Sequence, residues 1–272
     1  MRKIEIDETV LEYEVRGDGE PVLLIHPSVF ADALAHPLYR EPELSDGYAL
    51  IHYHRRAWVG SGRGDGPLDV MRHAADARAL LERLDVDRAH VVGHSYGGLI
   101  ALQLAGDAPE RVNTLILLEP ALRPPAGGRS QLEKVMAGAM QELRAGNRSG
   151  FLAIFGDALF GEGWRPILDA AVPGAFEQAV RDVDTFIEEQ PSLMAWELGP
   201  QLVGAITQPV LSVIGTRSPP FRSQQRELLH SLLPQTEDCD LDTGHLLQIQ
   251  DPAGAARALA GFFKRTARVG DR

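Results

Sequence analysis

Up to Leu118, the chain alternates between short apolar runs and stretches in which apolar positions recur every three or four residues. A continuous apolar run is typical of a strand buried on both faces, whereas the longer spacing is typical of a helix. The pattern predicts strands at 4–7, 11–16, 22–25, 48–52, 89–92 and 114–118, the first two forming a hairpin, and helices at 68–84 and 96–106. Strand–helix–strand alternation implies parallel pairing through right-handed crossovers.

The pattern changes after Glu119-Pro120. Residues 121–204 show helical patterns without a convincing strand, and the α/β alternation resumes near Val210. The predicted helices of this segment lie at 131–144, 151–160 and 176–189, followed by strands at 210–214 and 237–241 and helices at 223–233 and 252–264. We therefore predict an α/β core domain of residues 1–120 and 205–272, interrupted by a helical cap (lid) of residues 121–204.

Composition and charge narrow the range of partners. The 272 residues carry a formal net charge of −11, whereas phosphate binding needs clustered Lys and Arg. We therefore expect no nucleic-acid partner and no adsorption to an anionic membrane. No apolar run approaches the roughly 18 residues of a membrane span, and residues 1–7 lack the apolar stretch of a signal peptide.

A single cysteine, Cys239, leaves no internal disulfide and fits a reducing compartment. We expect a cytoplasmic protein that acts on a small-molecule substrate. The sequence leaves the oligomeric state open, a homodimer included.

A G-x-S-x-G motif is the main candidate for chemistry. Gly93-His94-Ser95-Tyr96-Gly97 stands between the strand predicted at 89–92 and the helix predicted at 96–106. A serine on such a tight strand-to-helix turn is pushed out of the sheet, and the residues two before and two after it have to be small. The helix N-terminus directs backbone N–H groups at the developing oxyanion. The context predicts Ser95 as a nucleophile; the alternative is an idle serine in a tight turn.

The sequence resembles the α/β-hydrolase superfamily over nearly its whole length. The resemblance rests on His26-Pro27 after the third strand, on the Ser95 motif and on Asp242-Thr243-Gly244-His245 near the C-terminus. Serine before acid before histidine is the chain order of this fold. The resemblance implies an α/β fold with a mostly parallel eight-stranded sheet flanked by helices, and an all-helical cap.

The resemblance also indicates a base and an acid. The loop that carries His245 resembles the family's catalytic-histidine loop, and a neutral imidazole accepts a proton near neutral pH. Many relatives have an aspartate where this chain has Ser218, which cannot carry the charge that stabilises an imidazolium. Other relatives take the acid from the end of the strand after the nucleophile helix, where Glu119 stands. We predict Glu119 as the acid, with Asp242 as the alternative.

Two backbone N–H groups are expected to form the oxyanion hole. Tyr96 follows the nucleophile and supplies one of them. The family usually has His-Gly after the third strand, where this chain has His26-Pro27. The donor in relatives is the next residue, which corresponds to Ser28, with Val29 as the alternative. His26 is expected to serve as a structural hydrogen-bonding group.

A metal and a cofactor are not expected. His52 and His54 share one face of a predicted strand, but the sequence gives no third ligand of suitable type nearby, and a zinc site needs at least three.

These features predict an esterase-like serine hydrolase. Its expected substrate is a carboxylic ester, thioester or lactone of a small to medium apolar molecule, cleaved through an acyl-enzyme. One alternative is a carbon–carbon bond hydrolase, or a biosynthetic cyclase or acyltransferase, on the same triad. The other is a non-catalytic ligand-binding or receptor protein that kept the fold.

Overall fold

The protein is built around an eight-stranded sheet with the strand order β1-β2-β4-β3-β5-β6-β7-β8. The computed structural model describes residues 1–123 and 126–270. β1 and β2 form an antiparallel hairpin, β2 pairs antiparallel with β4, and the remaining neighbours are parallel. The strands are β1 (Arg2–Ile6), β2 (Thr9–Arg16), β3 (Gly19–Ile25), β4 (Gly47–Tyr53), β5 (Ala89–His94), β6 (Val112–Leu118), β7 (Val210–Gly215) and β8 (Thr236–Leu241).

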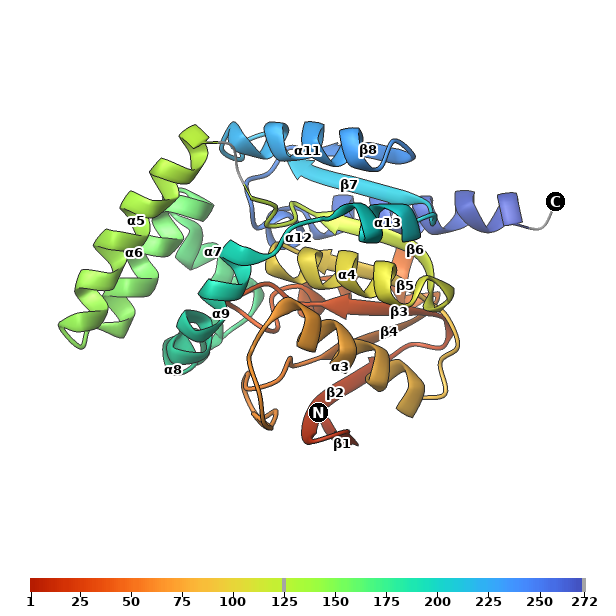
Figure 1. The fold of residues 1–272 in the computed structure, drawn as a ribbon, viewed down its shortest axis with the longest axis horizontal. Helices are drawn as coiled ribbons and strands as arrows, with labels where there is room; N and C mark the ends of the chain where they lie inside the picture. The colour runs from red at the N-terminus through yellow and green to blue at the C-terminus, as the bar shows by residue number, and fades with distance from the viewer. Residues whose placement is uncertain (124–125, 271–272) are drawn as a thin grey trace.

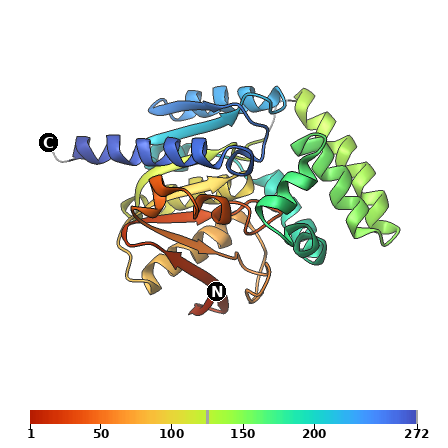
Figure 2. The ribbon, with the colours of Figure 1, turned by 180° about the vertical axis from the view of Figure 1, so that it is seen from behind.

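Helices cover both faces of this sheet (Figures 1 and 2). One face packs against α3 (Val70–Arg83), α4 (Tyr96–Asp107) and α11 (Phe221–Leu232), and its core includes Leu80, Leu99 and Leu229. The central α4 is nearly apolar all round because ten of its residues are buried, as expected for a helix inside the protein. The parallel strands are buried on both faces, which explains their continuous apolar sequences.

The opposite face carries the other helices of the core. They are α1 (Ala35–Leu38), α2 (Pro42–Ser45), α12 (Leu247–Gln250) and α13 (Pro252–Gly270). Leu38, Leu259 and Phe262 are among their buried contacts. Figure 2 shows the long α13 running across this face. The predicted fold class is confirmed: a mostly parallel eight-stranded sheet lies between helices.

The chain between β6 and β7 forms helices within its described part. All but the last of them gather beyond the ends to which the arrowheads of β3 and β7 point (Figure 1), and the last packs against α4. They are α5 (Ala126–Arg144), α6 (Arg148–Phe160), α7 (Trp164–Ala171), α8 (Ala175–Arg181), α9 (Val183–Ala195) and α10 (Pro200–Ala205). A short 3-10 helix, η1 (Pro109–Arg111), lies outside this segment, between α4 and β6. The division into a core and a cap of residues 121–204 stays a prediction, and its residues 124–125 and 271–272 lie outside the described residues.

One predicted helix is wrong in its extent. The segment 176–189 was expected to be continuous, but it divides into α8 and α9 at Asp182, whose ψ of 7° departs from helical geometry. The Asp182 N–H still donates to the Gln178 carbonyl, and the Asp182 carbonyl accepts from the Phe186 N–H. Because helical hydrogen bonds continue on both sides of Asp182, the apolar residues keep their helical spacing across the break. Periodicity alone therefore does not reveal this change of direction.

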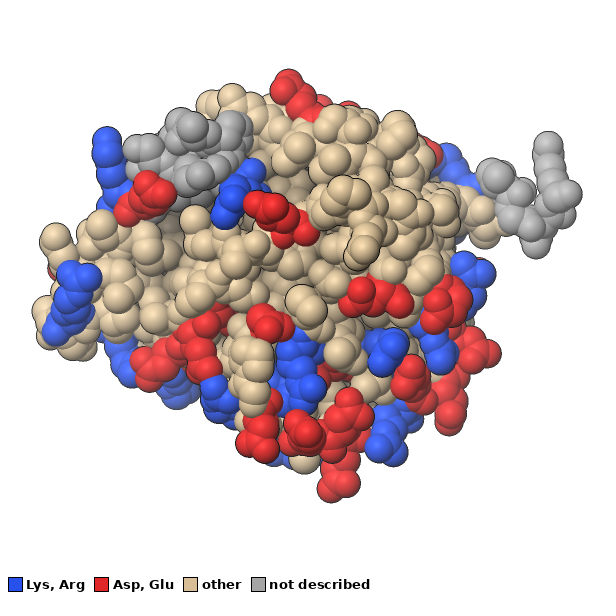
Figure 3. Space-filling view, viewed as in Figure 1, with Lys and Arg blue, Asp and Glu red and all other residues tan. Residues whose placement is uncertain are grey.

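The charged surface is mixed in sign. On the face seen in Figure 3, Lys and Arg side chains lie among Asp and Glu side chains. Within the described residues, no helix is long and apolar enough to cross a membrane.

Candidate active site

Ser95 occupies a strained turn between β5 and α4. Its backbone has a φ of 53° and a ψ of −116°, in the region that L-residues avoid. A Cβ on Gly93 would lie 2.3 Å from the Gly97 carbonyl oxygen, and one on Gly97 would lie 2.1 Å from the Ile25 carbonyl oxygen. Only glycine fits at both positions, which is the steric reason for the G-x-S-x-G spacing. Tyr96 begins α4, so its N–H is at the helix N-terminus.

His245 and Glu119 lie in direct contact. The His245 Nδ1–H donates to Glu119 Oε2 at 2.5 Å, and both side chains are buried. Glu119 follows β6 and has a φ of 42°. Its second oxygen, Oε1, accepts from the N–H of Gly215, the last residue of β7, at 2.8 Å. The two hydrogen bonds fix the carboxylate between the ends of β6 and β7 and the His245 loop.

Neither of the two other positions considered for the acid supplies a carboxylate to His245, although the Ser218 hydroxyl lies beside Glu119 and helps to lower its pKa. The Asp242 side chain is 84% exposed, and its carboxylate accepts from the Thr216 hydroxyl at 3.3 Å. Ser218 belongs to the turn after β7, where its N–H donates to the Gly215 carbonyl. Of the carboxylates weighed from the sequence, the structure brings Glu119 to His245.

The pKa values of Glu119 and His245 are both lowered, which keeps Glu119 ionised and His245 neutral near pH 7. Burial alone would raise the pKa of Glu119, but the hydrogen bond from His245 and the charges of His245 and Arg222 outweigh it and lower the pKa to about 2. Burial lowers the pKa of His245, and the Arg222 charge lowers it further, although Glu119 raises it. At neutral pH, Glu119 is therefore a carboxylate beside a neutral imidazole.

Arg222 is a residue of this site that the sequence analysis missed. It lies at the start of α11, is buried, and its Nη2 donates to His245 Nε2 at 3.2 Å. Its Nε is 3.4 Å from Glu119 Oε2. Within the described part of the chain, the hydrogen-bond partner of His245 Nε2 is thus Arg222, while Ser95 lies on the same pocket wall.

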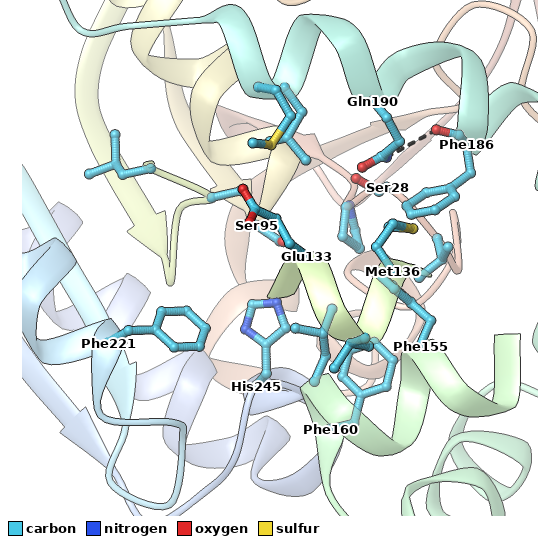
Figure 4. Close-up of a pocket in the computed structure, with 18 of the residues that line it drawn as sticks. Ser28, Ser95, Glu133, Met136, Phe155, Phe160, Phe186, Gln190, Phe221 and His245 are labelled. Carbon is cyan, nitrogen blue, oxygen red and sulfur yellow. Dashed lines mark hydrogen bonds between the residues drawn. The ribbon is translucent and has the colours of Figure 1, made fainter. Parts of the chain in front are cut away.

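A largely apolar cavity of about 440 Å³ opens in front of Ser95 and His245. Figure 4 shows Ser95 beside the His245 ring, with Phe221 and Phe160 on either side of the ring. The Phe160 ring is nearly parallel to the imidazole, with 5.9 Å between centroids. Further lining residues come from the loop after β3 and from α5, α6 and α9, among them Ser28, Val29, Met136, Phe155, Phe186 and Leu193.

The loop after β3 brings the predicted oxyanion donors to the cavity. Ser28 and Val29 both line it and are nearly buried. His26 supports the loop from behind: its Nδ1–H donates to the Pro27 carbonyl at 2.7 Å, and its Nε2 accepts from the Arg55 N–H at 3.0 Å. Both ring nitrogens of His26 are thus engaged with backbone groups.

The helical segment is joined to the core through a buried carboxylate. Glu189, on α9, accepts from the Trp58 indole N–H at 2.9 Å, lies 2.8 Å from His73 Nε2 and pairs with the Arg55 guanidinium. A carboxylate this deeply buried needs such partners, because desolvation would otherwise make the ionised form costly. These contacts hold α9 beside the pocket that it helps to line.

The expectation that His52 and His54 lack a third ligand is wrong. Asp32, on the loop after β3, places its Oδ1 3.1 Å from His52 Nε2 and 2.9 Å from His54 Nε2. The sequence gives no sign of this contact because Asp32 and the two histidines lie on different elements.

A histidine that bonds a buried carboxylate, beside a serine on a strand-to-helix turn at one edge of a mostly parallel sheet, is the arrangement of enzymes with the α/β-hydrolase fold. The chain belongs to the family described as "alpha/beta hydrolase fold", whose model matches residues 21–252.

Named relatives match part of the chain. A protein of Variovorax paradoxus (strain S110), named as the carbamate hydrolase RutD, is 40% identical over 126 residues, which are 43% of this chain and 44% of that protein. The 2-hydroxy-6-oxo-6-phenylhexa-2,4-dienoate hydrolase of Comamonas testosteroni is 31% identical over 122 residues, 43% of this chain and 42% of that protein. The matched stretches span less than half the length of these relatives.

Solved structures match nearly the whole chain. The enol-lactonase of Burkholderia xenovorans LB400 superposes with a TM-score of 0.78 at 19% identity, covering 97% of this chain and all of that one (100%). An esterase of Thermogutta terrifontis gives the same TM-score of 0.78 at 19% identity, covering 98% of this chain and 99% of that one. At such identities the likeness concerns the fold.

Proposed function

We propose that the protein is a serine hydrolase that cleaves a carboxylic ester, thioester or lactone of a small to medium apolar substrate through an acyl-enzyme. The observation that carries the proposal is the Glu119–His245 hydrogen bond of 2.5 Å beside Ser95 at the wall of an apolar cavity. A cavity of about 440 Å³ lies within the ordinary range for small-molecule sites.

Each residue has a defined task in this mechanism. Ser95 Oγ attacks the carbonyl carbon while His245 Nε2 takes its proton, and Glu119 stabilises the imidazolium that results. The N–H groups of Tyr96 and Ser28, with Val29 as the alternative to Ser28, bind the oxyanion. The imidazolium then protonates the leaving alcohol or thiol. In the second half, His245 activates the water that releases the acid and frees Ser95.

Proton transfer requires a change at His245. Nε2 accepts a hydrogen bond from Arg222 in the observed arrangement. The guanidinium therefore has to leave Nε2 before that nitrogen takes the proton of Ser95.

The test is turnover of p-nitrophenyl esters of increasing acyl length, with Ser95→Ala as the inactive variant. We expect turnover by the wild type, a fall of several orders of magnitude in Ser95→Ala, and a mass increase equal to one acyl group on the Ser95 peptide after rapid quenching. Turnover without an acyl adduct on that peptide, or unchanged turnover in Ser95→Ala, would refute the covalent mechanism.

The same assay separates the alternatives. An acyltransferase would need an acceptor other than water, so its products would change when an alcohol or amine is supplied. A ligand-binding protein would be stabilised by the ester analogue without releasing p-nitrophenol.

A further inference from the structure

A second cluster of polar side chains lies at the opposite end of the loop that carries Ser28. Asp32 lies near the end of this loop, and His36 follows on α1. His52 is the penultimate residue of β4, and His54 comes directly after that strand. The Nε2 atoms of His52, His54 and His36 lie 3.1, 2.9 and 3.5 Å from the same oxygen, Asp32 Oδ1. The nearest ligand atoms of Asp32, His52 and His54 are all within 4.8 Å of one another.

The separations from Asp32 Oδ1 are close to those between two ligand atoms of a tetrahedral metal site. Zinc binds imidazole nitrogen at about 2.0–2.1 Å, so two ligand atoms of a tetrahedral ion are about 3.3 Å apart. The three distances to Asp32 Oδ1 lie on either side of that value. Imidazole nitrogens with one carboxylate form a ligand set that suits zinc and its neighbours in the first transition series, whereas calcium and magnesium prefer oxygen ligands.

The hydrogen bonds around His54 point to a cation at the cluster. His54 Nδ1 is 3.0 Å from Glu12 Oε2, and Nε2 is 2.9 Å from Asp32 Oδ1, so a carboxylate faces each ring nitrogen. A neutral imidazole has one N–H and can donate to only one of them. The nitrogen without a hydrogen then faces an acceptor, unless a proton or a metal ion stands between the two.

Glu12 also provides the outer partner that metal-bound histidines usually have. A ligating imidazole typically donates its other N–H to a carboxylate, which fixes the ring orientation and the tautomer. With His54 Nδ1–H donated to Glu12, the Nε2 lone pair is directed at the cluster. Glu12 is itself held by the Gly60 N–H at 3.1 Å.

The cluster combines buried ligands with an open side. His52 and His54 are almost fully buried. The side chains of Asp32 and His36 are 28% and 37% exposed, so an ion has a route from solvent. A site that binds its ion after folding needs ligands held in place by the fold and a path for the ion from solvent. Buried His52 and His54 meet the first need, and partly exposed Asp32 and His36 meet the second.

We propose that Asp32, His52 and His54 bind one divalent transition-metal ion, for which Zn²⁺ is the probe, and that His36, which lies outside this group of three but 3.5 Å from Asp32 Oδ1, completes the site as the fourth ligand. The ion would tie the loop after β3 to the end of β4. Its role is structural, because none of the four residues lines the cavity, and it does not depend on the proposed hydrolase activity.

The experiment titrates the chelator-treated full chain with Zn²⁺ at pH 7.5 in a calorimeter. Asp32→Asn is the test variant, since it keeps the shape of the side chain but removes the carboxylate. Asp238→Asn is the matched control, because Asp238 also accepts from a histidine, His230 Nε2 at 2.9 Å, on a different part of the surface. His36→Ala is a second test at a partly exposed position, where loss of folding is not expected.

We expect one zinc ion per chain in the wild type and in Asp238→Asn, and at least a tenfold weaker affinity in Asp32→Asn and in His36→Ala. The midpoint of thermal unfolding should rise with zinc in the wild type and not in Asp32→Asn. With Co²⁺ in place of zinc, the intense visible absorption of a four-coordinate ion should appear in the wild type and be absent in Asp32→Asn. Absence of binding, or equal affinity in the wild type and either test variant, would overturn the proposal.

Discussion

Substitution of Glu119 by glutamine tests the proposed triad most directly, because it removes a charge with almost no change in shape. Glu119 accepts two hydrogen bonds, from the Gly215 N–H at 2.8 Å and from His245 Nδ1–H at 2.5 Å. Glutamine has one oxygen and one NH₂ group, so it can accept only one of the two. If its oxygen stays on Gly215, the NH₂ faces His245 Nδ1, which must then give up its hydrogen. The hydrogen moves to Nε2, and that nitrogen no longer accepts the proton of Ser95.

The opposite orientation of the amide is also unfavourable. If its oxygen faces His245, the NH₂ group faces the buried Gly215 N–H. Two donors then oppose each other, and neither the Gly215 N–H nor the NH₂ group has an acceptor. In either orientation the imidazolium loses its negative partner. In Ser-His-Asp proteases, the equivalent change of acid to amide lowers kcat about 10⁴-fold, a rise of about 5 kcal/mol in the barrier. We expect a loss of about 10³- to 10⁴-fold here.

The assay is the kcat for the p-nitrophenyl ester that the wild type turns over fastest. Asp242→Asn is the matched control, since Asp242 stands three residues before His245 but is exposed, and it should retain kcat within about threefold. Circular dichroism and thermal melts establish that both variants are folded. If Glu119→Gln keeps more than a tenth of the wild-type kcat, or if Asp242→Asn loses as much, Glu119 is not the acid.

Two further changes test the charges around the pocket. Arg222→Met removes the positive charge that, after burial, most lowers the pKa of His245. The acid limb of kcat/KM should therefore move to higher pH, since a raised pKa keeps the imidazole protonated up to a higher pH; an unmoved limb would contradict this. Glu189→Gln leaves Arg55 buried without its carboxylate and should lower the free energy of unfolding in urea by about 3 kcal/mol. Exposed Glu188→Gln should cost less than about 1 kcal/mol, and equal losses would refute the anchoring role.

The sheet could be predicted from sequence because burial on both faces leaves a direct trace. β5 and β6 are buried almost throughout, and their continuous apolar runs stand out from the amphipathic helices. The four-residue helices α1, α2 and α12 left no such trace, since a single turn shows no periodicity.

The candidate site was predictable where local sterics constrain the sequence. Ser95 needs small residues two positions away on both sides, because a Cβ at Gly93 or Gly97 would collide with a backbone carbonyl. The contact between Glu119 and His245 is of another kind. It depends on the φ of 42° at Glu119 and on the Gly215 N–H, neither of which a sequence pattern displays.

Arg222 and Asp32 could not be found because their partners are distant in the chain. Arg222 lines the pocket because it is the second residue of α11, and this helix begins at the pocket wall with Phe221. The next arginine of the same helix, Arg226, instead reaches Asp240 near the end of β8. Arginine is usually exposed, so the sequence offered no reason to place Arg222 at the pocket and to turn Arg226 toward β8.

Arg222 and Glu119 together decide which nitrogen of His245 carries the hydrogen. A guanidinium has only donors, so its contact with Nε2 requires a lone pair there, and the hydrogen of a neutral ring must then be on Nδ1. A carboxylate has only acceptors, so the contact of Glu119 with Nδ1 requires the same tautomer. This is the tautomer that a general base for Ser95 needs. The contact with Arg222 also occupies the lone pair that has to receive the serine proton, so in the proposed mechanism Arg222 prepares His245 and then has to leave it.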